Sequence, residues 1–166
     1  MAKKTTTLRE LDGTDRRILD LVQRDASLAQ AEIGKKVGLS TAAVHERLKK
    51  LEAAGVIRRW TAIVDPASIG VSVTAFVEVF FEHPRFEAGF LERMKHVDAV
   101  LEVHHITGEF SLLLKVRVRD MEGLQSLLLE KLGSHEGVRQ TRTVMVLSTV
   151  KEESYIDPLA KRGAEA

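Results

Sequence analysis

Residues 30–51, QAEIGKKVGLSTAAVHERLKKL, carry the pattern that decides the fold of the front part of the chain. Ile33 and Val37 lie one helical turn apart, and Gly38 follows where a glycine in the left-handed conformation commonly ends a helix. Ser40 is then a good N-cap for a second helix. The stretch therefore predicts two short helices joined by a tight turn, which is a helix-turn-helix.

The second of these helices has a clear apolar side. Val44, Leu48 and Leu51 share it, so the other side is left for contacts outside the domain. Gly34 lies four residues before the turn, where a missing side chain would allow the two helices to cross closely. That close approach would offset the roughly 1 kcal/mol that glycine costs within a helix.

The flanking residues extend the motif to a small domain. Residues 12–25, DGTDRRILDLVQRD, offer an apolar stripe for a preceding helix, and residues 55–64, GVIRRWTAIV, read as a turn and a strand. Three helices and a strand predict a winged-helix-like domain. The alternative is a plain pair of surface helices, because a charged stripe is often only a solvated face.

Charge is divided unevenly along the chain. The net charge is +1, yet residues 1–64 carry 13 Lys and Arg against 8 Asp and Glu, whereas residues 65–166 carry 12 against 16. A basic front and an acidic rear predict that only the front part meets a polyanion.

The rear part alternates strand and helix patterns. Its apolar residues recur with a period of two in the expected strands and with helical spacing between them. The expected elements are a strand at 71–82, a helix from Pro84, strands at 99–107 and 111–119, a helix from Asp120 to Gly133, and a strand at 138–150. The order βαββαβ predicts a ferredoxin-like sheet with both helices on one face.

The uncovered face of that sheet is also expected to be partly apolar. It carries either Phe76 and Phe80 or the alternating Val and Ala residues of the same strand, and periodicity alone leaves both open. An apolar open face predicts packing against a second copy, so a homodimer is the default expectation.

Composition removes several other classes. The chain has no cysteine, which excludes disulfides, thiolate catalysis and cysteine-bound metal centres. No apolar run suits a signal peptide or a membrane span, so we expect a soluble, cytoplasmic protein without a membrane partner. No cofactor and no metal site are expected. The residues after Pro158 are expected to be disordered.

Three stretches together resemble the leucine-responsive protein/AsnC (Lrp/AsnC, feast/famine) family of transcription regulators. They are LDGTDRRILDLVQRDA at 11–26, VGLSTAAVHERLKKLEAAGVI at 37–57 and TGEFSLLLKVRV at 107–118. The resemblance implies an α+β protein with an N-terminal winged helix-turn-helix domain and a C-terminal ferredoxin-like βαββαβ (RAM/ACT-like) domain. It also implies double-stranded DNA as partner, self-association into a dimer or an octamer of four dimers, and an amino-acid effector.

This organisation divides the chain into four parts. They are a DNA-binding domain at 8–60, a strand linker or hinge at 61–70, an effector-binding and oligomerisation domain at 71–152 and a C-terminal tail at 153–166. We expect a sequence-specific regulator that is effector-modulated and controls its own gene.

The DNA-binding candidates lie on and just after the second helix of the motif. The resemblance implies a recognition helix at Ser40–Lys50, in which Thr41, Ala42, His45 and Lys49 are the candidates for base edges. Candidates for phosphates are Ser40, Arg47, Lys50, Arg58 and Arg59. Two alternatives stay open: His45 as a plain surface residue, and Arg47 paired locally with Glu46 or Glu52.

The effector candidates are less regular. Amino-acid-responsive members of the family usually have a loop Gly-Asp/Glu-aromatic-Asp, whereas this chain has Gly108, Glu109, Phe110 and Ser111. Losing the last acid removes a charge-assisted hydrogen bond, usually worth roughly 1.5–3 kcal/mol, to an effector's ammonium. Glu109 substitutes for it, or the effector is not a simple α-amino acid, or there is none. The expected pocket lining is Thr107, Gly108, Glu109, Ser111, Thr143, Val144 and Met145.

Two other functions stay open at this stage. His104 and His105 invite comparison with tetrapyrrole (sirohaem-type) decarboxylases of similar fold, although adjacent strand residues point to opposite faces and cannot share one site. The rear part alone would also suit a ligand-binding regulatory module without DNA binding. Neither reading accounts for the cationic helix-turn-helix, so an enzyme is not expected.

Overall fold

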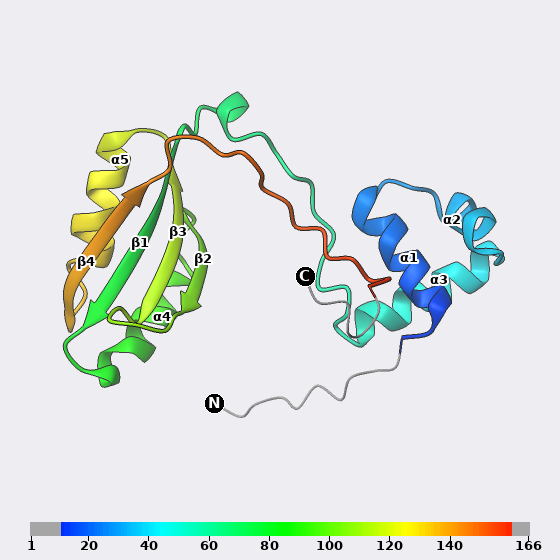
Figure 1. Cartoon of the computed structure of the whole chain (residues 1–166), viewed down its shortest axis with the longest axis horizontal. Helices are drawn as coiled ribbons and strands as arrows, with labels where there is room; N and C mark the ends of the chain where they lie inside the picture. The colour runs from blue at the N-terminus through cyan, green and yellow to red at the C-terminus, as the bar shows by residue number, and fades with distance from the viewer. Residues whose placement is uncertain (1–10, 161–166) are drawn as a thin grey trace. The chain divides into compact units, whose positions relative to one another are not determined.

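The computed structural model describes residues 11–160 and divides them into two compact units. Residues 11–62 and 152–160 form the first, and Ile63–Lys151 form the second. The first unit is helical, and in the second unit helices lie against a sheet (Figure 1). No helix within 11–160 is both long and apolar enough to cross a membrane.

The first unit contains α1 (Gly13–Arg24), α2 (Gln30–Val37) and α3 (Thr41–Ala53). The expected ends are confirmed: Gly38 adopts the left-handed conformation with φ of 74°, and the Ser40 hydroxyl accepts a hydrogen bond from the Ala43 N–H. The core between the helices consists of Ile18, Val22, Ile33, Val44 and Leu48, with further apolar residues packed around it.

One element expected in this unit is not formed. Residues 55–64 contain a turn but no strand, and the prediction of a wing strand within the chain was wrong in that respect. A strand requires a hydrogen-bonded neighbour, and in the chain by itself these residues have none. Ile63 and Val64 are consequently left 83% and 56% exposed.

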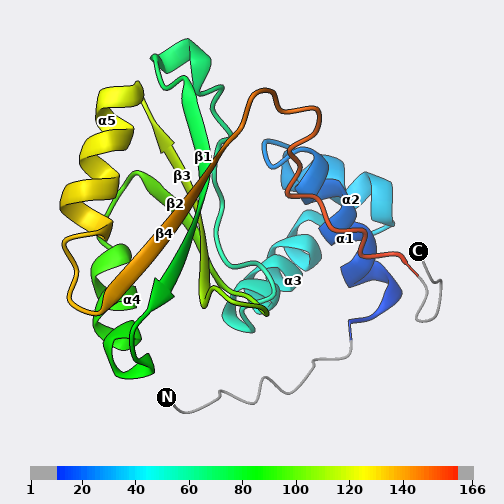
Figure 2. The same ribbon diagram turned by 60° about the vertical axis from the view of Figure 1, so that its left-hand side comes forward.

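The second unit has the expected βαββαβ order. Its elements are β1 (Val73–Phe81), α4 (Glu87–Met94), β2 (Val100–His105), β3 (Leu112–Val118), α5 (Met121–Ser126) and β4 (Val138–Met145), with short 3-10 turns η1 (Ala67–Ile69) and η2 (Pro84–Phe86). The antiparallel sheet has the strand order β2-β3-β1-β4, and α4 and α5 lie on the same face of it (Figure 2).

Two elements differ from the expected ranges. The second helix changes to a π-helical segment, η3 (Leu127–Leu132), in which the Gly133 N–H donates to the Leu128 carbonyl five residues earlier. The last strand ends at Met145 instead of residue 150: its register with β1 ends at the pair Ala75 and Met145, and one further bond runs from the Val146 N–H to the Thr74 carbonyl at 3.0 Å. Sequence periodicity detects neither change, since both depend on backbone pairing.

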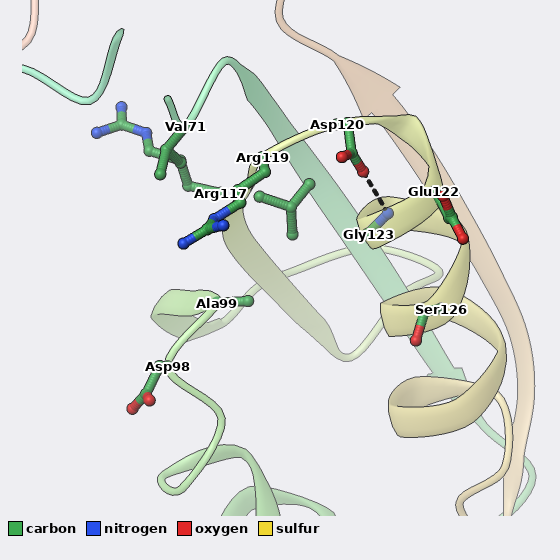
Figure 3. A pocket seen from close by; sticks show the side chains of 10 residues that line it. Val71, Asp98, Ala99, Arg117, Arg119, Asp120, Glu122, Gly123 and Ser126 are labelled. Atoms are coloured by element: carbon green, nitrogen blue, oxygen red, sulfur yellow. Dashed lines mark hydrogen bonds between the residues drawn. The ribbon is translucent and has the colours of Figure 1, made fainter. Parts of the chain in front are cut away.

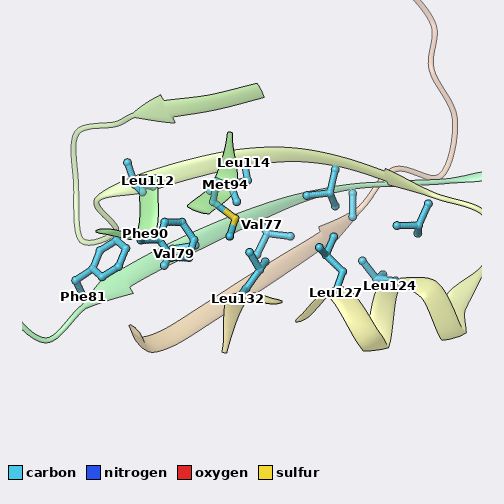
Figure 4. Close-up of a cluster of buried hydrophobic side chains, with 13 residues drawn as sticks. Val77, Val79, Phe81, Phe90, Met94, Leu112, Leu114, Leu124, Leu127 and Leu132 are labelled. Atoms are coloured by element: carbon cyan, nitrogen blue, oxygen red, sulfur yellow. The ribbon is translucent and has the colours of Figure 1, made fainter. Parts of the chain in front are cut away.

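The core of the second unit lies between the sheet and the helices (Figure 4). The alternating residues Ala75, Val77, Val79 and Phe81 of β1 are all buried there. Phe76 and Phe80 therefore belong to the open face. Packing against α4 and α5 thus decides between the two alternatives that periodicity left open.

Candidate nucleic-acid interface

The turn between α2 and α3 is tight because Gly34 has no side chain. The Leu39 N–H donates to the Gly34 carbonyl at 2.9 Å, which brings the start of the turn back onto α2. A Cβ atom at Gly34 would lie 2.5 Å from the Leu39 carbonyl oxygen. Gly34 does make a close approach, but to the backbone of the turn residue Leu39 and not through the expected close crossing of the two helices.

The outer face of α3 is exposed over its whole length. Val44, Leu48 and Leu51 are buried and hold the helix on the domain. The outward residues are Ser40, Thr41, Ala42, His45, Glu46, Lys49 and Lys50, all exposed. Within residues 11–160 no ion pair joins Lys49, Lys50, Arg58 or Arg59 to a carboxylate, so these cations are available to an anionic partner.

Glu46 is on the outer face of α3 but was not among the DNA-binding candidates. It lies among the predicted DNA contacts and is exposed. A carboxylate on a face that meets phosphates is unfavourable unless it accepts a hydrogen bond, for which the cytosine N4 amino group is suited. Its helical position one turn after Ala42 was the available signal.

Arg47 was predicted to contact phosphate, but in the structure it is ion-paired with two carboxylates. One guanidinium nitrogen, Nη1, donates to Asp12 Oδ2 and to Asp15 Oδ1, both at 2.7 Å. These bonds raise the pKa of Arg47, those to Asp12 contributing most. Its carboxylate partners are therefore at the start of α1, and the alternative pairing with Glu46 or Glu52 was wrong.

Asp12 also caps α1. Its Oδ1 accepts a hydrogen bond from the Asp15 N–H at 2.7 Å, and this bond followed by the one from Arg47 holds the pKa of Asp12 below its usual value. Asp15 is the one buried charged residue among residues 11–160. The cluster of Asp12, Asp15 and Arg47 thus fixes the orientation of α3 against α1.

Trp60 lies after α3 and is hydrogen-bonded to that helix. Its indole N–H donates to Glu52 Oε1 at 2.7 Å, which holds the segment after α3 against the helix. A cavity of about 300 Å³ lies beside this contact, lined in part by His45, Lys49 and Leu28. His45 and Lys49 therefore border both the exposed face of α3 and a recess next to it.

The predicted effector residues fall into two groups within one chain. Thr107, Gly108 and Glu109 are exposed in the hairpin loop, and Gly108 has the positive φ of 115° that the loop requires. The Ser111 N–H donates to the Val79 carbonyl at 3.0 Å. This places the hairpin loop at the Val79 end of β1.

Thr143, Val144 and Met145 lie on the other side of β1. They pair with Val77, Phe76 and Ala75, which are two to four residues from Val79 and therefore about 7–13 Å along the strand. One chain by itself does not bring the two groups into one pocket.

Phe110 is not free to reach a ligand in this arrangement. It is 6% exposed, its ring meets Phe80 edge-on at 6.4 Å, and the Arg142 guanidinium lies 4.9 Å from its ring centre. The aromatic residue of the loop instead packs the hairpin onto the open face of the sheet.

The second unit has a cavity of its own, of about 570 Å³, at the opposite end of β3 from the hairpin. Figure 3 shows Arg117 and Arg119 on one side of it and Glu122 and Ser126 on the other. The Asp120 carboxylate accepts from the Gly123 N–H at 2.8 Å, so it caps α5. None of the predicted effector residues lines this cavity.

The two histidines that invited an enzyme reading lie apart. His104 faces the open side of the sheet, with Nε2 3.0 Å from Glu102 Oε2, whereas His105 Nδ1 is 3.6 Å from Glu87 Oε1 on α4. The expectation that adjacent strand residues cannot share one site is confirmed for this pair.

Comparison with known proteins assigns both units. The family model described as winged helix-turn-helix DNA-binding matches residues 11–58, and the model described as Lrp/AsnC ligand binding domain matches residues 74–156. The two matched segments cover most of the described chain.

Individual relatives agree with these matches. The chain is 38% identical over 146 residues to an HTH-type transcriptional regulator of Pyrococcus abyssi, covering 88% of this chain and 95% of the relative. It is 35% identical over 150 residues to the leucine-responsive regulatory protein of Escherichia coli, covering 89% and 92%. The crystal structure of a Neisseria meningitidis transcriptional regulator in complex with L-Met superposes with a TM-score of 0.82 at 31% identity, covering 88% of this chain and 96% of that one.

Proposed function

The chain belongs to the Lrp/AsnC family of DNA-binding transcriptional regulators, and from that premise we propose that α3 reads operator DNA in the major groove. The observation that supports this assignment is the exposed outer face of α3, whose lysines have no carboxylate partner in residues 11–160. Thr41, Ala42, His45 and Lys49 would contact base edges, and Ser40, Lys50, Arg58 and Arg59 would contact phosphates.

Binding is tested by a fluorescence titration with DNA from upstream of the chain's own gene and with scrambled DNA of equal length, at several salt concentrations. A preference for the upstream DNA that persists as salt rises supports autoregulation by sequence reading. Equal, salt-labile binding would contradict autoregulation and leave only the electrostatic attraction of a basic domain.

Single substitutions on α3 can distinguish contacts to base edges from contacts to phosphates. For each variant, the preferred DNA sequence is selected from random duplexes. Lys50→Ala should weaken binding to all sequences and lower the salt slope by about 0.9, the value of one phosphate contact. Thr41→Ala and Lys49→Ala should change the selected sequence. Lys131→Ala, on the exposed surface of the other unit, is the matched control and should change neither. An unchanged selection with Thr41→Ala and Lys49→Ala would refute the groove assignment.

We propose a homodimer that forms through the open face of the sheet. Phe76 and Val144 are paired neighbours on that face, and Val144 is 52% exposed. A second copy would cover this apolar surface and also set two α3 helices at a fixed separation on one duplex. An octamer of four such dimers would follow from further contacts between dimers.

The effector proposal also depends on a second copy, because the hairpin residues and Thr143–Met145 are apart in one chain. A neighbouring copy would supply the missing wall, and Glu109 would bind an ammonium group in place of the acid that Ser111 replaces. The printed names of relatives, leucine-responsive and L-Met complex, support an amino acid or a close derivative. A thermal-shift screen of amino acids tests this: Glu109→Gln should abolish a shift that Glu136→Gln retains, and equal shifts in both would refute it.

We propose that the chain has four parts, at 8–60, 61–70, 71–152 and 153–166. Two stretches of these parts, 8–10 and 161–166, lie outside the described residues. The second stretch includes most of the segment that was expected to be disordered. A regulator of DNA works where the DNA is, which is the reason for expecting it in the cytoplasm. No contact in residues 11–160 favours the decarboxylase reading over this one.

A further inference from the structure

The C-terminal segment is docked on α1 at residues 155–158, on the face turned away from the helical core. The side-chain amide of Gln23 makes two bonds with Ile156: Nε2 donates to the Ile156 carbonyl and Oε1 accepts from its N–H, both at 3.0 Å. Arg16 Nη1 donates to the Pro158 carbonyl at 2.7 Å. These bonds are made with backbone atoms of residues 155–158, which we call the strap.

Tyr155 adds a side-chain anchor to the strap. Its hydroxyl donates to Asp20 Oδ1 at 2.7 Å and accepts from Arg24 Nη2 at 2.9 Å, while the Arg24 guanidinium lies 4.6 Å from its ring centre. Asp20 and Arg24 are themselves paired at 2.9 Å. The four strap contacts on α1, at residues 16, 20, 23 and 24, follow helical spacing and so form one continuous site.

The strap gives the helix-turn-helix unit a second covalent connection. Residues 63–72 lead from this unit into β1, and residues 146–154 lead from the end of β4 back to the strap. A unit held by one linker of about ten residues can reorient widely, and a second, anchored linker removes part of that freedom.

Resting on the proposed function, we infer that Tyr155 and Gln23 are positioning residues, which restrict the orientations of the DNA-reading unit through the docked strap. Two restricted units in a dimer would accept only operators with a narrow range of half-site spacings. The strap should therefore make the affinity for two half-sites depend more strongly on their separation. It should leave the affinity of α3 for one half-site unchanged.

The test compares the wild type with the double variant Gln23→Ala, Tyr155→Ala. Ile156→Ala is the matched control, because the Ile156 side chain is 75% exposed and this residue binds Gln23 through its backbone. Binding is measured to duplexes with one half-site and with two half-sites at stepped separations. We expect the double variant to reduce the affinity ratio between best and worst spacing at least threefold, with single half-site affinity unchanged and Tyr155→Phe intermediate.

A second measurement needs no DNA. The chain has no cysteine, so Glu32→Cys, exposed on α2, can carry one fluorophore. Its anisotropy decay reports rotation of the helix-turn-helix unit, and the double variant should enlarge the fast component whereas Ile156→Ala should not.

The outcomes separate the two proposals. An unchanged anisotropy decay in the double variant overturns the strap inference, whether or not DNA binds. The strap inference is also overturned if the double variant binds one half-site more weakly while its affinity depends on half-site separation as in the wild type. That result would indicate that Gln23 and Tyr155 only stabilise the fold. Enlarged local rotation with no DNA binding by the wild type upholds the tether and refutes the proposed DNA reading instead.

Discussion

Arg47, Asp12 and Asp15 form the ion-paired contact that joins α3 to α1. The Arg47 side chain is 31% exposed and that of Asp15 only 4%, so one end of the cluster is shielded from water. An unpaired carboxylate at Asp15 would be costly, because it could not be solvated. Sequence reasoning placed Arg47 among the phosphate contacts, since its partners lie more than thirty residues earlier and helical spacing does not reveal them.

Replacing Arg47 by Ala should lower the free energy of unfolding of the helix-turn-helix unit by about 2 kcal/mol. This is less than the loss of a fully buried pair, because Arg47 is partly solvated. Trp60 is the one tryptophan of the chain and reports this unfolding by fluorescence. The salt slope of DNA binding should not change.

Arg59→Ala is the reciprocal control for Arg47. Arg59 is exposed and makes no ion pair within residues 11–160, so its removal should leave stability unchanged and lower the salt slope by about 0.9. A stable Arg47→Ala variant with a reduced slope would show that Arg47 contacts phosphate after all.

Asp12 should make the stability of the same unit pH-dependent. Its pKa is lower in the folded state, so the stability it contributes is complete above the unfolded-state pKa of about 3.9 and disappears as the pH falls through the lower folded-state pKa. Urea unfolding followed through Trp60 should show a difference between the wild type and Asp12→Asn near pH 6 that shrinks towards pH 2.5. A difference that is constant with pH would contradict this.

At the scale of elements, the α2–α3 turn depends on one missing side chain. Gly34→Ala should destabilise the first unit by roughly 1–3 kcal/mol, because its Cβ would overlap the Leu39 carbonyl, although alanine is the better helix former. Chemical unfolding followed by Trp60 fluorescence measures this.

Gly89→Ala is the matched control within α4. Its Cβ would meet nothing closer than His135 at 3.7 Å, an ordinary contact, so this change should be neutral or stabilising by up to about 1 kcal/mol in calorimetry of the second unit. Equal destabilisation by both changes would mean that the space around Gly34 is not what matters.

An element could be predicted from the sequence where the residues that determine it lie close together in the chain. α2, the Gly38 stop and the Ser40 cap depend on residues within a turn of each other, and their predicted positions are confirmed. The strand expected in 55–64 depends on a partner that the chain does not supply. Sequence reasoning also missed the π-helical segment and the early end of β4, which depend on backbone hydrogen bonds that side-chain periodicity does not record.

At the scale of the whole molecule, the open face of the sheet carries the paired residues Phe76 and Val144, and Val144 is 52% exposed. Val144→Asp should convert the proposed dimer to a monomer, because a charge would be buried without a partner in the interface. Val144 is half exposed in the chain by itself, so the fold should tolerate the change. Light scattering coupled to size-exclusion chromatography measures the mass.

Leu129→Asp serves as the control for Val144. Leu129 is 63% exposed on the π-helical segment, away from the open face, and its substitution should preserve the dimer. A dimer that survives Val144→Asp would place the interface elsewhere on the molecule.

The sequence by itself determined the helix-turn-helix, the βαββαβ order and the family, because caps, turns and hydrophobic periods act over a few neighbouring residues. Only the tertiary structure decided which face of β1 is buried, which carboxylates bind Arg47, and that Tyr155 reaches α1. These contacts join residues far apart in the chain, and their geometry is set by the packing of whole elements, which no local pattern encodes.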